Sequence, residues 1–181
     1  MTRMVALLRA VNVGGTRKVP MADLRAALTA EGFADVATYI QSGNVVLTSG
    51  LGAAATAAAF EAAFARRFGF EAPVVVRTAA EWAAYAGDGP FAEARRDRPH
   101  LLHLCLAAGP MKPGAAEAVR AKAAAGEQVE AAGDALWIDY PGGAGTSKIT
   151  PAVLDRAAGA PVTSRNWNTV QKLQAMLAGS A

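Results

Sequence analysis

The chain has 181 residues, 52% of them hydrophobic and 18% charged, a composition that excludes a largely disordered protein. Its single cysteine excludes an internal disulfide, and one cysteine with two histidines cannot build a four-ligand zinc site, so we expect no metal and no cofactor. The formal net charge of +3 permits an anionic partner without requiring one.

The first half of the chain alternates strand and helix patterns. Residues 4–13 are a nearly continuous apolar run, typical of a central strand that is covered on both faces. Pro20 suits the first turn of a helix that ends near Gly32. Two strands that form a hairpin, a second helix and another strand are predicted at residues 36–40, 45–48, 53–68 and 73–77. The order β-α-β-β-α-β is that of the split unit of ferredoxin-like folds.

The second half repeats this order. Thr78 and Glu81 have the spacing of a capping box at the start of a short helix, and the polar stretch 87–99 is interpreted as a linker. The later strands are predicted at residues 100–107, 128–131, 135–140 and 161–163, and the later helices at 113–125, 150–158 and 165–177. The prediction is an α+β protein of two ferredoxin-like halves, residues 1–86 and 100–181, that arose by internal duplication, each an antiparallel sheet with helices packed on it.

The most informative motif is the loop Asn12-Val13-Gly14-Gly15-Thr16-Arg17-Lys18, which joins the first strand to the first helix. Backbone N–H groups in such a loop can face an anion, and paired glycines let the anion come close. The spacing matches neither the nucleotide-triphosphate loop nor the dinucleotide-binding turn. The alternative interpretation is a tight surface turn with a solvated lysine.

A hairpin turn, Gln41-Ser42-Gly43-Asn44, should lie beside this loop, because a split β-α-β unit places both at the same end of the sheet. Hydroxyl, amide and ammonium groups that converge there suit a phosphate or a carboxylate. The predicted ligand-binding residues are Arg9, Asn12, Gly14, Gly15, Lys18, Ser42, Gly43 and Asn44. In the alternative interpretation, Ser42 and Asn44 satisfy only the backbone of their own turn. As surface changes, Lys18→Ala and Asn44→Ala are each expected to alter stability by less than about 1 kcal/mol.

A second candidate cluster combines the glycine loop 142–148 with the start of the last helix, which should lie at the same end of the second half. On that helix, Trp167, Val170, Leu173 and Leu177 form the predicted buried stripe. The polar residues of this second cluster are Lys148, Arg165, Asn166, Asn168 and Thr169. The alternative is simple capping of the helix around a tryptophan anchor.

Side chains for catalysis are not evident. His100 and His103 point to opposite faces of a strand, whereas His103 and Cys105 share a face and are interpreted as core positions. No pair of carboxylates suits general acid–base catalysis, so the sequence suggests a binding site but does not reveal a reaction. The run 95–98, Arg-Arg-Asp-Arg, is interpreted as solvated, with contact to a nucleic acid backbone as the alternative.

Several motifs together are specific: Leu8-Arg9-Ala10-Val11-Asn12-Val13-Gly14-Gly15, Lys18-Val19-Pro20-Met21, Tyr39-Ile40-Gln41-Ser42-Gly43-Asn44-Val45 and Thr163-Ser164-Arg165-Asn166-Trp167-Asn168-Thr169-Val170. Through them the chain resembles, over nearly its whole length, the bacterial family catalogued as domain of unknown function 1697 (DUF1697). The resemblance implies a duplicated α+β, ferredoxin-like fold and no particular reaction.

Three functions compete at this point. The first is a binding protein or an enzyme for a small phosphate- or carboxylate-bearing ligand. The second is RNA binding, although residues 5–11 and 45–48 lack the aromatic side chains on which an RNA-recognition sheet stacks bases. The third is a protein–protein adaptor. No stretch approaches the roughly 20 apolar residues of a membrane helix and the start has no signal-peptide pattern, so we expect a cytoplasmic protein without a membrane partner.

Overall fold

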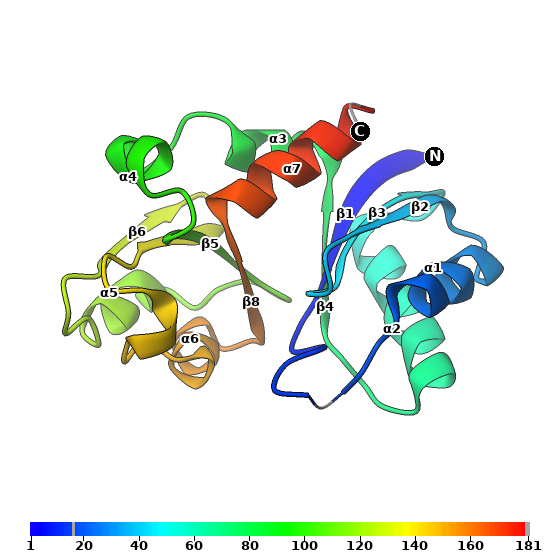
Figure 1. The fold of residues 1–181 in the computed structure, drawn as a ribbon, viewed down its shortest axis with the longest axis horizontal. Coiled ribbons are helices and arrows are strands. Elements are labelled where there is room, and N and C mark those ends of the chain that lie inside the picture. Colours follow the sequence, from blue (N-terminus) through cyan, green and yellow to red (C-terminus); the bar gives the residue numbers. More distant parts are fainter. Residues whose placement is uncertain (16, 180–181) are drawn as a thin grey trace. The chain divides into compact units, whose positions relative to one another are not determined.

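The computed structural model describes residues 1–15 and 17–179 and divides the chain into two compact units. The first unit comprises Met1–Ala84 together with the C-terminal residues from Leu173 onward, and the second comprises Tyr85–Lys172. Each unit contains one four-stranded antiparallel sheet with helices packed on it (Figure 1). The predicted α+β fold with two similar halves is confirmed.

The sheet of the first unit has the strand order β2-β3-β1-β4, as the split β-α-β unit requires. Its elements are β1 (Thr2–Leu8), α1 (Met21–Ala30), β2 (Ala34–Tyr39), β3 (Asn44–Ser49), α2 (Ala53–Phe68), β4 (Val74–Thr78) and the first part of α3 (Ala79–Ala86). Helices α1 and α2 lie on one face of this sheet, where Leu24 and Phe60 share an apolar core with Ala6 of β1 (Figure 1). Val5 and Leu7, which point to the other face, are buried as well, as the continuous apolar run predicted.

The second unit repeats this arrangement with the strand order β6-β7-β5-β8. Its elements are α4 (Ala92–Asp97), β5 (Leu102–Ala107), α5 (Ala115–Arg120), β6 (Gln128–Ala132), β7 (Ala135–Asp139), the 3-10 turn η1 (Ala144–Thr146), α6 (Pro151–Ala158), β8 (Val162–Asn166) and the start of α7 (Trp167–Leu177). Val119 of α5 and Leu154 of α6 pack with Cys105 and Ile138 in its core. In the described residues, no helix combines the length and the apolar character needed to cross a membrane.

Several boundaries differ from the predicted ones. Strand β1 ends at Leu8 rather than at residue 13, because Ala10 and Asn12 adopt positive φ angles of 56° and 55°, which turn the chain. Helix α5 stops at Arg120 rather than at residue 125. The backbone N–H groups of residues 124 and 125 donate to the carboxylate of Glu127, so they do not continue the helix.

Two further differences lie in the second unit. The stretch 87–99, interpreted as a linker, contains helix α4. The segment predicted as extended only at residues 161–163 is the full strand β8, and α7 begins at Trp167 rather than at residue 165. The reason is a helix cap: the side-chain oxygen of Asn166 accepts a 3.0 Å hydrogen bond from the N–H of Thr169.

Candidate functional site

The loop between β1 and α1 is shaped by the side-chain amide of Asn12. Its Nδ2 donates to the carbonyls of Val19, at 3.0 Å, and of Gln41, at 2.7 Å, and its Oδ1 accepts from the N–H of Val19 at 2.8 Å. The N–H of Asn12 also donates to the carbonyl of Arg17 and so closes the loop. Because both amide hydrogens are already used, Asn12 positions the loop and has no free donor for a ligand.

The hairpin turn between β2 and β3 lies against this loop, as the topology predicted. The N–H of Leu8 donates to the carbonyl of Gly43 at 2.9 Å. Gly43 has a φ of +75°, and a Cβ built there would lie 2.7 Å from Leu8 Cβ and 2.9 Å from Val11 Cγ2. Only glycine allows this close approach, which fixes the turn on the end of β1.

Asn44 and Ser42 hold the turn itself. Asn44 is completely buried, and its Nδ2 donates to the carbonyl of Tyr39 at 3.1 Å and to the hydroxyl of Ser42 at 2.9 Å. These are the turn-stabilising bonds of the alternative interpretation. Asn44 is therefore not a surface residue, and we expect Asn44→Ala to destabilise the protein, because the substitution would remove a buried polar network.

The outward side of the loop carries glycine backbone and cationic side chains. Gly14 and Gly15 are exposed with φ angles of +61° and +76°, and no atom lies within 4 Å of a Cβ built on either. Lys18 is exposed, whereas the Arg17 guanidinium lies 5.0 Å from the Phe70 ring centroid and donates to a backbone carbonyl.

Three more residues of the sequence motifs border this loop. Arg9 is half-buried just after β1, and its N–H donates to the carbonyl of Pro73. Val13 on the loop and Ile40 beside the hairpin turn are large apolar side chains that are 64% and 52% exposed. Thr16, also part of the motif, lies outside the described residues.

The second candidate cluster is assembled only in part. Asn166 caps α7 at Thr169, and Arg165 Nη1 donates to the hydroxyl of Thr163 and the carbonyl of Ser164. Burial lowers the pKa of Arg165 to about 10. Asn168 is exposed in the first turn of α7. Lys148 is exposed in the loop before α6, and among the described residues no hydrogen bond or ion pair joins it to the other four.

The buried stripe predicted on α7 is present at Val170, Leu173 and Leu177. Trp167 is an exception, because it is only half-buried. Its ring lies beside that of Trp137, with 5.7 Å between the centroids, and under the guanidinium of Arg95 at 4.3 Å. The tryptophan is therefore anchored by a tilted ring contact and a cation–π contact rather than by complete burial.

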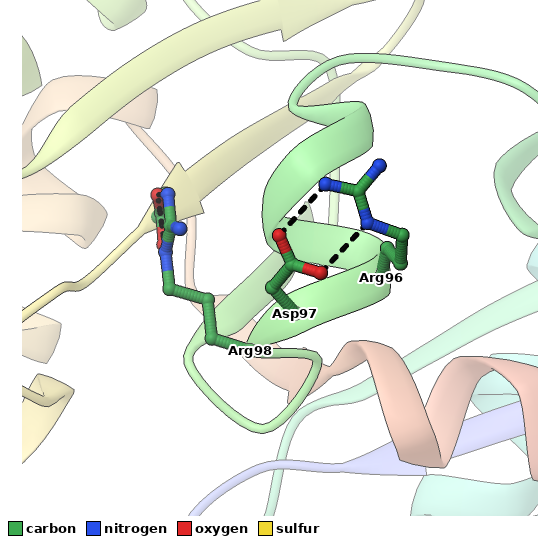
Figure 2. A network of polar contacts seen from close by, with 4 residues as sticks. Arg96, Asp97 and Arg98 are labelled. Atoms are coloured by element: carbon green, nitrogen blue, oxygen red, sulfur yellow. Dashed lines mark hydrogen bonds and ion pairs between the residues drawn. The ribbon is translucent and has the colours of Figure 1, made fainter.

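All three arginines of the run 95–98 are engaged by the protein itself. Beyond its contact with Trp167, Arg95 Nε donates to the carbonyl of Pro90. Figure 2 shows Arg96 paired with Asp97 on α4, while Arg98 points away from them. Arg98 Nε lies 3.1 Å from both carboxylate oxygens of Asp139, which is completely buried. These contacts argue against a phosphate-binding role for the run.

Sequence analysis missed one polar pair, which lies at the end of the second sheet. His103 of β5 and Ser164 of β8 are 2.9 Å apart, from Nδ1 to Oγ. The shared face of His103 and Cys105 was visible in the sequence, but their serine neighbour depends on which strands pair. In the described part of the chain, no three His, Cys, Asp or Glu side chains gather as ligands for a metal ion.

Comparison with known proteins identifies the fold and a family. A family model described as "Protein of unknown function (DUF1697)" matches residues 1–137. No curated protein matches the chain. Among solved structures, the chain is similar to the conserved bacterial protein SP0830 from Streptococcus pneumoniae, with 24% sequence identity, a TM-score of 0.76 and coverage of 97% of this chain and 98% of that one. This likeness shows the shared fold.

Proposed function

The chain belongs to the family of unknown function DUF1697, so its role must be argued from its own geometry, and we propose that it binds a small phosphate- or carboxylate-bearing ligand at the loop between β1 and α1. The observation that carries this proposal is the clamp made by Asn12. It joins one end of the glycine-paired loop to Val19 at the other end and to Gln41 of the hairpin turn. A loop whose two ends are already anchored has less conformational entropy to lose on binding.

The chemistry of the loop suits an anion. Gly14 and Gly15 expose successive backbone groups in a turn, and such N–H groups form concave sites for anions. Open space around both glycines lets a ligand oxygen approach the backbone. Lys18 supplies an exposed positive charge. We assign the main charge to Lys18 because the Arg17 guanidinium already contacts Phe70.

The remaining predicted residues have different parts in this proposal. Asn12 and Asn44 position the loop and the hairpin through side-chain hydrogen bonds, and Gly43 does so through close packing. Val13 and Ile40 add exposed apolar surface beside the loop. The ligand we expect therefore carries an apolar portion next to its phosphate or carboxylate.

A thermal-shift series tests the proposal. Inorganic phosphate, acetyl phosphate and short-chain carboxylates are added to wild type, to Lys18→Ala and to Lys122→Ala, with sodium chloride at equal ionic strength as reference. Lys122 is an exposed lysine of the second unit that belongs to neither candidate cluster. At 100 times its dissociation constant a ligand stabilises by about 2.7 kcal/mol, or roughly 5 to 10 °C for a chain of this length. We expect the shift in wild type and Lys122→Ala and its loss in Lys18→Ala.

Equal shifts in all three proteins would show unspecific stabilisation and contradict the proposal. No shift with any anion would favour the second candidate function, a protein–protein adaptor. The specific observation in its favour is the exposure of Val13 and Ile40 on the two segments that Asn12 joins. Isolated exposed apolar side chains are common, so this observation ranks second.

A further inference from the structure

Three polar side chains lie side by side in the second sheet. His103 and Cys105 alternate along β5 on the face that holds the core with α5 and α6, and Ser164 of β8 is the strand partner of Cys105. His103 Nδ1 and Ser164 Oγ are 2.9 Å apart. Cys105 is completely buried, whereas His103 and Ser164 are half-buried and so retain access to solvent.

The first unit has apolar side chains at the equivalent positions. In β1, Met4 pairs with Thr78, and in β5, His103 pairs with Asn166; each partner is the last strand residue before a helix. This alignment gives three pairs of equivalent residues: Met4 and His103, Ala6 and Cys105, and Val76 and Ser164. The three residues of the first unit are all buried in its apolar core. The fold therefore does not require polar groups at these positions, and polar groups that a fold does not need often mark a functional site.

The protonation states of these side chains determine which atom donates the hydrogen bond between Ser164 and His103. Burial lowers the pKa of His103 below its ordinary 6.5 and raises the pKa of the Cys105 thiol to about 12. Near neutral pH the imidazole is therefore neutral and the thiol is protonated. In the neutral tautomer that carries its hydrogen on Nε2, Nδ1 of His103 accepts the hydrogen bond from the Ser164 hydroxyl.

A ring contact also holds the imidazole of His103 in place. The ring of Tyr140 packs edge-on against the ring of His103, with 5.1 Å between the centroids. A hydroxyl that donates to a fixed neutral imidazole is the arrangement in which a serine becomes nucleophilic. General bases in such pairs contribute about 10²- to 10⁴-fold to the rate of proton transfer steps.

We infer that Ser164 is a nucleophile activated by His103, and that the second unit accepts an acyl group from small activated esters. In the step proposed, Ser164 Oγ bonds to the ester carbonyl carbon while its proton passes to Nδ1 of His103. The bond from that carbon to the leaving oxygen breaks, the oxygen takes the electron pair, and His103 returns the proton to it. The products are acyl-Ser164 and an alcohol or phenol.

The test uses p-nitrophenyl acetate as the probe, with the acetylated residue located by peptide mass spectrometry. Ser164→Val and His103→Met install the residues that the first unit carries at these positions, so both variants are expected to fold. Ser147→Ala is the matched control, because the Ser147 hydroxyl donates to the carboxylate of Glu127 and not to a histidine. We expect acetyl-Ser164 in wild type and in Ser147→Ala, none on residue 164 in Ser164→Val, and acetylation at least about 100-fold slower in His103→Met.

Two results would overturn the inference. One is absence of acetyl-Ser164 in wild-type protein that unfolds cooperatively. The other is an unchanged rate of Ser164 acetylation in His103→Met, which would make the pair structural. If His103→Met fails to fold, His103→Gln provides the same comparison of rates.

Discussion

The side-chain amide of Asn12 donates a 2.7 Å hydrogen bond to the backbone carbonyl of Gln41, a residue 29 positions further along the chain. Together with its two bonds to Val19, this contact lets one side chain set the geometry of two loops. Asn12 also has a φ of 55°, a conformation that asparagine tolerates better than most residues. The proposed ligand site therefore depends on a residue that does not touch the ligand.

Asn12→Ala is expected to lower the free energy of unfolding by about 2 to 4 kcal/mol, because three hydrogen bonds are lost and backbone groups lose their partners. It should also weaken anion binding although Lys18 is retained. Urea unfolding measures the first effect and the thermal-shift series the second. Lys18→Ala is the comparison, since it should weaken binding while stability changes by less than about 1 kcal/mol. A stable Asn12→Ala protein with normal anion binding would refute the clamp.

Gly43→Ala is expected to be far more damaging than Gly69→Ala. Both glycines have a φ of +75°, but a Cβ at Gly43 meets Leu8 Cβ at 2.7 Å, whereas nothing lies within 4 Å of a Cβ at Gly69. Each variant pays about 1 to 2 kcal/mol for the left-handed backbone. The collision at Gly43 adds roughly 1 to 3 kcal/mol of overpacking. Equal unfolding midpoints for the two variants would show that the hairpin turn can move away from β1.

Arg98→Met is expected to lower the urea midpoint much more than Arg96→Met. The partner of Arg98, Asp139, is completely buried and would become an unpaired buried carboxylate. Arg96 and Asp97 form a pair at the surface, with side chains 72% and 53% exposed, and such pairs contribute little (Figure 2).

A double variant completes this comparison. In Arg98→Met with Asp139→Leu, the charge and its partner are removed together, so stability should recover part of the loss seen in Arg98→Met. If the single and double variants unfold at the same urea concentration, the carboxylate of Asp139 is not what destabilises the single variant.

The lowered pKa of Glu127 predicts that the stability of the fold decreases at acidic pH. Hydrogen bonds from the Ser147 hydroxyl and from the N–H groups of Ala125 and Ala124 lower the pKa of Glu127 to about 2, from an ordinary 4.5. Because the pKa is lower in the folded state, the stabilisation is complete above pH 4.5 and is lost as the pH falls toward 2. Glu127→Gln should lower stability at pH 7 and flatten the fall in unfolding free energy between pH 4.5 and 2. An equally steep fall in this variant would assign the acid sensitivity to other carboxylates.

Much of the fold follows from local sequence patterns. The apolar run through Val5 and Leu7 predicts a buried strand, and β1 lies there. Gly69 predicts the end of a helix, and α2 ends there. Helix α4 could not be predicted in this way, because its helical contacts include the stacking of Arg95 on tryptophans distant in the sequence. The sequence predicted that α7 begins at Arg165. It begins at Trp167, because the side chain of Asn166 caps the helix.

The candidate sites were predictable to a smaller extent. The topology alone predicts that the loop and the hairpin turn lie together. It does not predict the role of Asn12, because an asparagine beside glycines is equally suited to contact a ligand and to hold the loop by hydrogen bonds. The partnership of His103 with Ser164 requires the register of two strands 61 residues apart. Such contacts depend on tertiary pairing, which composition and periodicity do not encode.

The membership of the C-terminal residues in the first unit affects how the chain folds as it is synthesised. When Ala84 has left the ribosome, the first unit still lacks the residues from Leu173 onward, including the buried Leu173 and Leu177. The nascent first unit is therefore complete only after the whole second unit has been translated. A stop codon shortly before Leu173 would accordingly remove two buried leucines from the unit encoded at the opposite end of the gene.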